Sequence, residues 1–473
     1  MRCAAGWALL LFLLTALPAS AATIEPGAVD IRLARRSLPE WIRGALAAAP
    51  EMAVARAEVA VRERRLGAAQ AARFLPEFHA LSIGGIARRA RGTVLEPLDS
   101  TSVNAYGPFT QVEVQFVQPL FTWGKITSSI EAAAHAVEAQ LASGERTGNA
   151  IVEQAKDLYF NVLLARTLYG IVAETADGYD EALVTARERR DDGDTEITEL
   201  DILYLRVGRA EIKKQLPRLQ VGAEIALQAL RILGGESRTA ALDVAERFLD
   251  PVPATVRAIS WYEEQLFEQS PDWQQLQFGI AAQARQRDAL EADYYPSLFL
   301  SGTFAYAYAP RRQRQLNPFA FDRFNYLRGP GGVLGVRWPL NFHLTAARVA
   351  AAQAEVEKLQ AESRRARSGL RLQLQEAYDG VTQARESLEV LEDGRKAGRT
   401  ILTFAVTNFD IGIGDASEIL QALGNYARVS SSYYDFVKQY DMALARLTRV
   451  TGEEVMHLEG ITPGHRWEAP GLR

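Results

Sequence analysis

The sequence predicts a mainly α-helical chain that carries two β-hairpins and is built from two similar halves. Three observations predict this class. The proline-free stretches 125–190 and 344–408 have the apolar periodicity of very long helices. Four stretches of about 10 residues alternate apolar with polar side chains, as half-buried strands do. The same order of landmarks occurs twice when the chain is shifted by about 220 positions, which indicates an internal tandem duplication.

The shifted copies align Trp41 with Trp261, Pro76 with Pro296, and Pro119-Leu120 with Pro339-Leu340. We therefore expect a first structural repeat over 22–250 and a second over 251–454, followed by a C-terminal tail over 455–473. Each repeat should contain short helices, a β-hairpin, a long helix and a return helix.

The N-terminal segment 1–21 has the features of a secretory signal peptide. Arg2 precedes an apolar run, and Ala19-Ser20-Ala21 is a small-residue cleavage site, so cleavage is expected near Ala21. The only cysteine, Cys3, lies inside this segment, which leaves no disulfide in the mature chain. The net charge of -5 gives no reason to expect nucleic acid as a partner.

The first repeat should open with a capping box at Ser37 and Glu40 and a short helix to Ala49. A second helix over 51–74 ends before Pro76, and a hairpin follows at about 77–118, where Pro119 is expected to end the return strand. A long helix over about 125–190, an acidic turn and a return helix over about 198–233 complete the repeat. Pro217 predicts a kink in the return helix.

The long helix has a heptad seam, because apolar side chains alternate spacings of four and three at 151, 155, 158, 162, 165, 169, 172 and 176. This spacing predicts left-handed supercoiling against neighbouring helices. At 1.5 Å per residue, such a helix is about 100 Å long. The two shorter helices of the repeat together approach this length, so we expect them to stack end to end along it.

The second repeat should contain a helix over 271–295, a hairpin over 297–338 with a loop at 310–330, a long helix over about 344–408 and a return helix over about 416–450. The tail from residue 460 onward should be irregular. Along the strand 297–308, one face carries leucine, phenylalanine and tyrosine, as a lipid-facing strand near an aromatic girdle does.

Four strands per chain match the span of membrane strands but cannot close a barrel, and open sheet edges are not tolerated in lipid. Several copies must then share one barrel. Two copies give eight strands with a filled interior, whereas three give twelve strands and a lumen. We expect three copies, because polar side chains should point inward at Gln111, Glu113, Gln115, Ser301 and Thr303.

The sequence Gln118-Pro-Leu-Phe-x-x-Gly124 after a strand, Trp338-Pro-Leu340 in the second copy, and the glycine-containing turns before long seams resemble the TolC family of outer-membrane efflux proteins. The resemblance covers nearly the whole mature chain. It implies a homotrimer in the outer membrane of a Gram-negative bacterium, with a twelve-stranded β-barrel continuing into a periplasmic α-barrel. It further implies export of small molecules or proteins, as in tripartite efflux or type I secretion, with a periplasmic adaptor (membrane fusion protein) and an inner-membrane pump.

In that family the two helix–helix turns form the periplasmic tip, which gates the tunnel and meets the adaptor. The matching segments are 193–201 and 409–421. The resemblance implies gate or lumen positions at Thr198, Glu199, Phe409, Asp415, Glu418 and Gln421, and turn or adaptor-contact positions at Gly193, Asp194, Gly412 and Gly414. Glu418 would keep one acidic ring, and Gly414 replaces a gate-locking arginine. The strand-to-helix motif comprises Pro119, Leu120, Gly124, Pro339 and Leu340.

No catalytic motif is present, and the five histidines are scattered without metal-ligand spacing, so we expect no enzyme activity, no metal and no cofactor. A secreted coiled-coil scaffold or adaptor without a pore is the alternative. It would use the same heptads but would not need four amphipathic strands.

Overall fold

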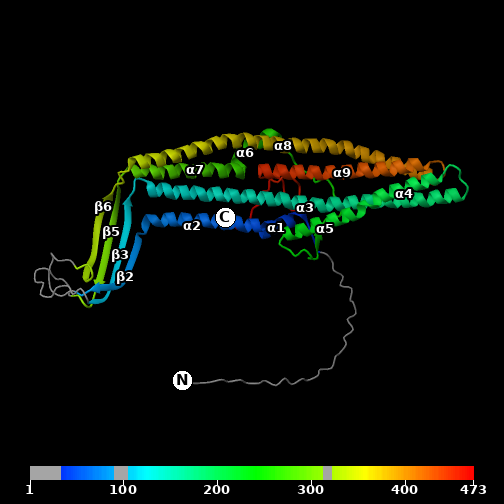
Figure 1. The fold of residues 1–473 in the computed structure, drawn as a ribbon. Coiled ribbons are helices and arrows are strands. Elements are labelled where there is room, and N and C mark those ends of the chain that lie inside the picture. Colours follow the sequence, from blue (N-terminus) through cyan, green and yellow to red (C-terminus); the bar gives the residue numbers. More distant parts are fainter. Residues whose placement is uncertain (1–33, 90–104, 313–321, 473) are drawn as a thin grey trace, which may run out of the picture.

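A computed structural model describes residues 34–89, 105–312 and 322–472. Figure 1 shows an elongated molecule in which long helices run side by side, while a four-stranded sheet extends from one end. The expected signal peptide, residues 1–21, lies outside the described residues, as do parts of both hairpin loops.

The first repeat begins with α1 (Leu38–Ala48) and α2 (Pro50–Phe74), which confirms both predicted short helices. The Glu40 carboxylate accepts a hydrogen bond from the Ser37 backbone N–H at 2.8 Å, as a capping box requires. Trp41 and Ile42 on α1 are completely buried. The short helix therefore packs its apolar face into the core that it shares with α3 and α5.

The sheet contains β2 (Glu77–Arg88), β3 (Tyr106–Phe121), β5 (Ser297–Tyr308) and β6 (Tyr326–Arg337), antiparallel in the order β2-β3-β5-β6. In this register Glu113 lies opposite Ala305 and Gln115 opposite Thr303. Because side chains alternate between faces, the polar residues share one face, and Val114 shares the other with its partner Phe304. The predicted polar and apolar faces are confirmed.

Two strand limits differ from the prediction, and both involve prolines. β3 does not end before Pro119 but continues to Phe121, with a shift in register between these two residues. β6 begins at Tyr326, so the predicted loop to Pro330 was too long. There the register shifts opposite Thr303 and Ala305, next to Pro330. A bulge leaves one residue unpaired, so each proline, which has no N–H to donate, is accommodated within a strand.

The predicted long helices are α3 (Lys125–Asp191), with 67 residues, and α8 (Phe342–Asp410), with 69 residues. Their length is about 100 Å at 1.5 Å per residue. The heptad seam of α3 is largely buried, including Ile151, Ala155, Val162 and Ala176. The apolar seam thus faces neighbouring helices, as its spacing predicts.

The return helix of the first repeat is two helices, α4 (Glu199–Lys213) and α5 (Gln215–Leu233), whereas the second repeat has one, α9 (Ala416–Thr451). The prediction of one kinked helix over 198–233 was wrong in detail, because the break lies at Lys214, before Pro217. Proline cannot donate to the carbonyl four residues earlier and its ring clashes with it, so the preceding turn is interrupted.

The second repeat also contains α6 (Ile259–Gln269) and α7 (Pro271–Glu291). The predicted helix to Tyr295 ends instead in a 3-10 turn, η1 (Ala292–Tyr294). In Figure 1, α2 is followed by α5 and α4 along α3, and α7 is followed by α9 along α8. The expected end-to-end stacking of shorter helices along each long helix is confirmed.

The middle of the helical part, around β1, β4 and the tail residues 454–467, holds two features that the sequence did not predict, and we call this region the waist. The strands β1 (Ala34–Arg36) and β4 (Leu242–Val244) form a small parallel pair. Nearby, the Lys156 ammonium donates to both carboxylate oxygens of Glu454 at 2.6 and 2.8 Å, and both side chains are completely buried. The Trp467 indole N–H donates to Glu454 at 2.8 Å, which fastens the irregular C-terminal tail to α3.

None of the helices within the described ranges is both long and apolar enough to cross a membrane.

Candidate functional site

The two turns singled out in the sequence meet at the end of the molecule farthest from the sheet, where α3 joins α4 and α8 joins α9 (Figure 1). Both helical hairpins pack on one apolar core. Its buried members include Tyr179, Leu183, Ile202, Leu205, Phe409, Ile419 and Leu423. We call this end of the molecule, residues 179–205 and 405–423, the tip.

The first turn is closed by Gly193 and Asp194. Gly193 has a φ of 92°, which favours glycine because it has no Cβ. The Asp194 carboxylate accepts hydrogen bonds from the Glu196 backbone N–H and the Arg189 Nε, both at 2.8 Å. These bonds lower the pKa of Asp194. Asp194 is therefore held in place as an anion within the turn.

Thr198 begins α4 as its N-cap, forming a reciprocal capping box with Asp201. The Asp201 backbone N–H donates to the Thr198 hydroxyl at 3.2 Å, and the Thr198 backbone N–H donates to the Asp201 carboxylate at 2.9 Å. Glu199 pairs with Arg190 on the exposed side of the turn. In this chain both predicted gate positions make local contacts.

The second turn depends on Gly412 and Gly414. Gly412 has a φ of 81°, and a Cβ at Gly414 would lie 3.1 Å from the Phe409 backbone nitrogen. Asp415 is the N-cap of α9, accepting a hydrogen bond from the Glu418 backbone N–H at 2.7 Å. The close approach at Gly414 explains why a large side chain does not fit there.

Glu418 and Gln421 lie on the exposed face of α9. The buried positions of its first turns are Ala416, Ile419, Ala422 and Leu423, so residues 418 and 421 point away from the tip core. The Gln421 amide donates to the Ser417 hydroxyl at 3.2 Å. Both side chains are placed to face a space outside this chain.

Phe409 is instead fully buried, which excludes a lumen-lining position for this side chain in the present structure. Its ring lies under Arg189, whose guanidinium carbon is 5.1 Å from the ring centroid. The prediction of Phe409 as a lumen residue is corrected: it is a core residue of the tip.

Arg189, which sequence reasoning missed, joins the two turns. Its Nη1 donates to the carbonyl oxygens of Phe409 at 3.2 Å and Gly414 at 3.0 Å, and its Nη2 donates to that of Gly412 at 3.4 Å. Its Nε donates to Asp194 on the first turn. We call this set of bonds the Arg189 clamp. A basic residue in the last turn of a helix, where carbonyls lack partners, was the available signal.

The strand-to-helix motifs redirect the chain from sheet to helix. Gly124 is the N-cap of α3 with a φ of 86°. The preceding Trp123 donates from its indole N–H to the Pro296 carbonyl at 2.8 Å. Pro119 lies within β3, whereas Pro339 lies between β6 and α8. The neighbouring Leu120 and Leu340 are both exposed. The Trp123 bond thus ties the β3–α3 connection to the residue that precedes β5.

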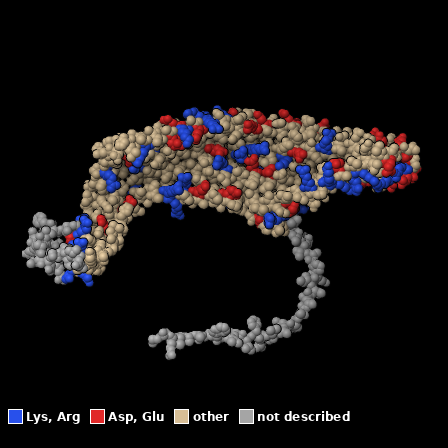
Figure 2. All heavy atoms as spheres, in the orientation of Figure 1, with Lys and Arg blue, Asp and Glu red and all other residues tan. Residues whose placement is uncertain are grey.

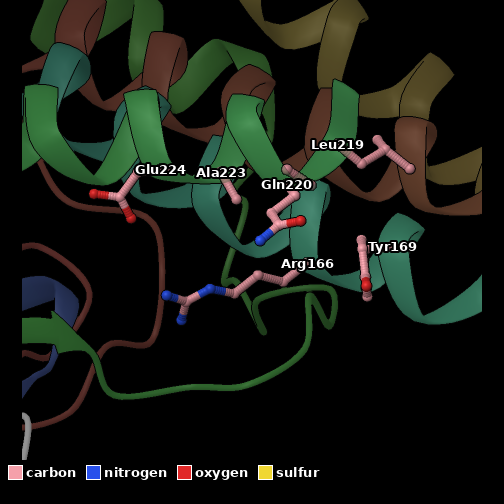
Figure 3. Close-up of a pocket in the computed structure, with 7 residues that line it drawn as sticks. Arg166, Tyr169, Leu219, Gln220, Ala223 and Glu224 are labelled. Carbon is pink, nitrogen blue, oxygen red and sulfur yellow. The ribbon is translucent and has the colours of Figure 1, made fainter. Parts of the chain in front are cut away.

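A shallow groove of about 460 Å³ lies between α3 and α5 near the waist (Figure 3). Its charged residues already have partners. Arg166 donates to Asp243 at 2.7 Å, and Glu224 accepts from Gln228 at 3.0 Å. We therefore assign the groove to packing. Across the described residues, no cluster of three or more His, Cys, Asp or Glu side chains could hold a metal ion.

Comparison with known proteins identifies the family. The sequence profile of the outer membrane efflux protein family matches residues 41–236 and 263–453. No curated protein matches the sequence. Among solved structures, the outer-membrane channel OprN has 18% identity and a TM-score of 0.71, covering 88% of this chain and 89% of its own.

Two further solved structures share the fold. The Campylobacter jejuni CmeC outer membrane channel has 16% identity and a TM-score of 0.71, covering 88% of this chain and 85% of its own. The outer membrane protein VceC from Vibrio cholerae has 16% identity and a TM-score of 0.70, covering 88% and 96%.

The family is one of channels rather than enzymes. It confirms the resemblance drawn from the duplicated motifs and removes the pore-free scaffold as an alternative. The chain belongs to the outer membrane efflux protein family, and it shares its fold with solved outer-membrane channels.

Proposed function

We propose that three copies of the chain form one export channel, in which their sheets close a single barrel in outer-membrane lipid. The open sheet carries this proposal. β2 and β6 are edge strands, so each copy leaves two rows of unpaired backbone groups. Such edges are not tolerated in lipid. Pairing β6 of one copy with β2 of the next satisfies both rows, and three copies give twelve strands around a lumen.

The apolar face of the sheet supports lipid as its surroundings. Phe78 on β2 and Leu334 and Val336 on β6 are 64 to 66% exposed in the single chain. Each lies on the face opposite the polar residues of β3. An outward apolar face and a polar interior are typical of membrane barrels.

The tip is proposed as the periplasmic gate and the adaptor-docking surface. Gly193, Asp194, Gly412 and Gly414 shape the two turns, while Glu418 and Gln421 face the lumen, where three copies of Glu418 form a ring that attracts cations. Asp415, Thr198 and Glu199 hold the helix starts in place. The Arg189 clamp takes the role that an arginine at position 414 would have, because it ties the two hairpins of each chain together.

An adaptor and an inner-membrane pump complete the proposed system, since the family serves efflux and the chain carries no recognisable nucleotide-binding motif of its own. We further propose cleavage of a signal peptide near Ala21, two structural repeats over 22–250 and 251–454, and a periplasmic tail over 455–473. The two matched family segments support the repeats.

The test is to purify the protein from the outer-membrane fraction, measure its mass in detergent, and reconstitute it in a planar bilayer. We expect a mass of three chains plus detergent and stepwise ion conductance. A stable monomer, or a trimer without conductance under any condition that opens the tip, contradicts the proposal.

A further inference from the structure

The described segments beside the β5–β6 loop, residues 309–312 and 322–325, fold back over the end of the sheet farthest from the helices. They form a compact group that we call the outer cluster. Its members are Arg311, Arg312, Asp322, Phe324 and Asn325. The contacts of these residues assign the cluster to one face of the sheet.

Arg312 is the centre of the outer cluster. Its Nε donates to both carboxylate oxygens of Asp322 at 2.9 and 3.2 Å, and its Nη1 donates to the Arg88 carbonyl at 2.6 Å. The Asn325 amide donates to the Arg312 carbonyl at 2.8 Å. The Arg312 and Asp322 side chains are only 16% and 6% exposed. This nearly buried ion pair holds both sides of the loop together.

The cluster lies on the polar face of the sheet. The pairing of β2 with β3 is regular, so Gly107 and Phe109 point to the same side as Glu113. The Phe324 ring meets the Phe109 ring edge-on at 5.0 Å between centroids. The Arg311 side chain covers Gly107, because a Cβ there would lie 2.7 Å from its Cδ.

The cluster also crosses the sheet. Arg312 follows β5, but its guanidinium reaches the carbonyl of Arg88 at the end of β2, on the far side of β3. Arg311 donates to the Tyr106 carbonyl at 2.8 Å on the way. The side chains of Arg311 and Arg312, which follow β5, thus extend across the hairpin formed by β2 and β3.

We infer that the outer cluster narrows the barrel lumen at its outer end and that Arg312 is the residue that positions it. The inference rests on the proposed barrel, in which the polar face lines the lumen. A group folded onto that face from each of three copies reduces the exit cross-section. Figure 2 shows basic side chains gathered at this outer end, whereas the strands themselves are largely uncharged on the face shown.

The experiment uses a Cys3→Ser chain, which has no other cysteine, with a reporter at Thr303→Cys. Thr303 lies opposite Gln115 on the polar face, deeper than the outer cluster. Intact cells are treated from outside with a small and a bulky membrane-impermeant thiol reagent. We expect Arg312→Ala to raise the ratio of bulky to small labelling rates severalfold.

Two further variants make the comparison specific. Phe324→Ala removes the ring that rests on Phe109 but leaves the Arg312–Asp322 pair, and it should change the ratio in the same direction. Arg337→Ala is the matched control. Arg337 lies 5.0 Å over the Phe299 ring at the opposite end of the same sheet, so its removal should leave the ratio unchanged.

The outcomes separate the inference from the proposed channel. Val114→Cys, on the apolar face, serves as the reference for an inaccessible thiol. If Thr303→Cys reacts no faster than Val114→Cys, the polar face does not line a lumen and the barrel itself is wrong. If Thr303→Cys reacts readily but neither Arg312→Ala nor Phe324→Ala changes the ratio, the cluster only joins the two hairpins and the inference is overturned.

Discussion

Arg189 shows what a single residue contributes at the tip and why sequence reasoning did not find it. Its position near the end of α3 favours bonds to free carbonyl groups, which a sequence can suggest. The carbonyl groups that it actually meets belong to Phe409, Gly412 and Gly414, more than 200 residues later. Only the packing of the two hairpins on one core brings them together.

We expect Arg189→Ala to loosen the tip, because four bonds between or within the turns are lost while the apolar core remains. The reconstituted channel should show a severalfold higher open probability or conductance. Arg190→Ala is the control, since Arg190 pairs with Glu199 on the same turn without reaching the second turn. Equal conductance of Arg189→Ala and Arg190→Ala would exclude the clamp as the lock.

Asp441, buried in α9 at the waist, should make stability depend on pH. Burial raises the pKa of its carboxyl group to about 8, whereas an unfolded aspartate titrates near about 4. Between these values the folded chain binds more protons than the unfolded chain, so the free energy of unfolding falls as pH rises.

Asp441→Asn should flatten this dependence, because the amide cannot ionise but can still accept the Val252 backbone N–H, which Asp441 binds at 3.0 Å. Denaturant unfolding at several pH values from about 4 to 8.5 measures the slope. Asp410→Asn, at an exposed position, is the control. An unchanged slope in Asp441→Asn would show that this carboxyl group does not titrate as described.

Among the elements, the sheet had the most predictable faces, but the residues at which its strands begin and end were the least predictable. Alternation fixed which face is polar, since Glu113 and Val114 must point to opposite sides. The limits depended on how Pro119 and Pro330 are accommodated, and a bulge cannot be inferred from proline alone. Likewise, Pro217 predicted a disturbance of the return helix but not its division into α4 and α5.

The two faces of β3 predict opposite tolerance to charge. Val114→Lys places an ammonium on the apolar face and should reduce trimer yield in the outer membrane, at a cost of about 2 to 4 kcal/mol per site at mid-membrane. Gln115→Lys, one residue later on the polar face, should assemble normally. Heat-modifiable trimer on gels of membrane fractions is the readout. Equal yields of the two variants would mean that the faces do not differ in their surroundings.

The exposed face of α9, which carries Glu418, predicts an effect on the ion selectivity of the channel. Glu418→Ala should weaken the cation preference of the channel without affecting assembly, because three carboxylates are lost from the proposed ring. Reversal potentials across a salt gradient measure this preference. Glu51→Ala, exposed at the start of α2 far from the tip, is the control. An unchanged reversal potential in Glu418→Ala removes this residue from the gate.

In the proposed channel, the length of the helices separates the tip from the outer cluster. The Arg189 clamp lies at one end of α3 and α8, and the outer cluster lies at the far end of the sheet. Because no described contact joins them, we expect each to act on its own. Under the proposed assembly, a substrate would pass the tip first and the outer cluster last.

The overall architecture could be predicted from sequence because it depends on repetition and length. A heptad seam and a duplicated strand-to-helix motif are each supported by many residues, so the prediction does not depend on any single one. The waist was not predicted, since β1 and β4 have only three residues each and the buried Lys156–Glu454 pair joins positions almost 300 residues apart. Short elements and distant polar pairs leave no periodic signal.

Electron microscopy of the protein extracted from the outer-membrane fraction shows the symmetry and length of the particles, and so tests whether three copies form one channel. We expect a three-fold hollow cylinder longer than about 100 Å, since α3 alone has nearly this length. Its strands should form one shared barrel at one end, and the three tips should converge at the other. A thin rod without a lumen, or particles of any other symmetry, would contradict a channel formed by three copies of this chain.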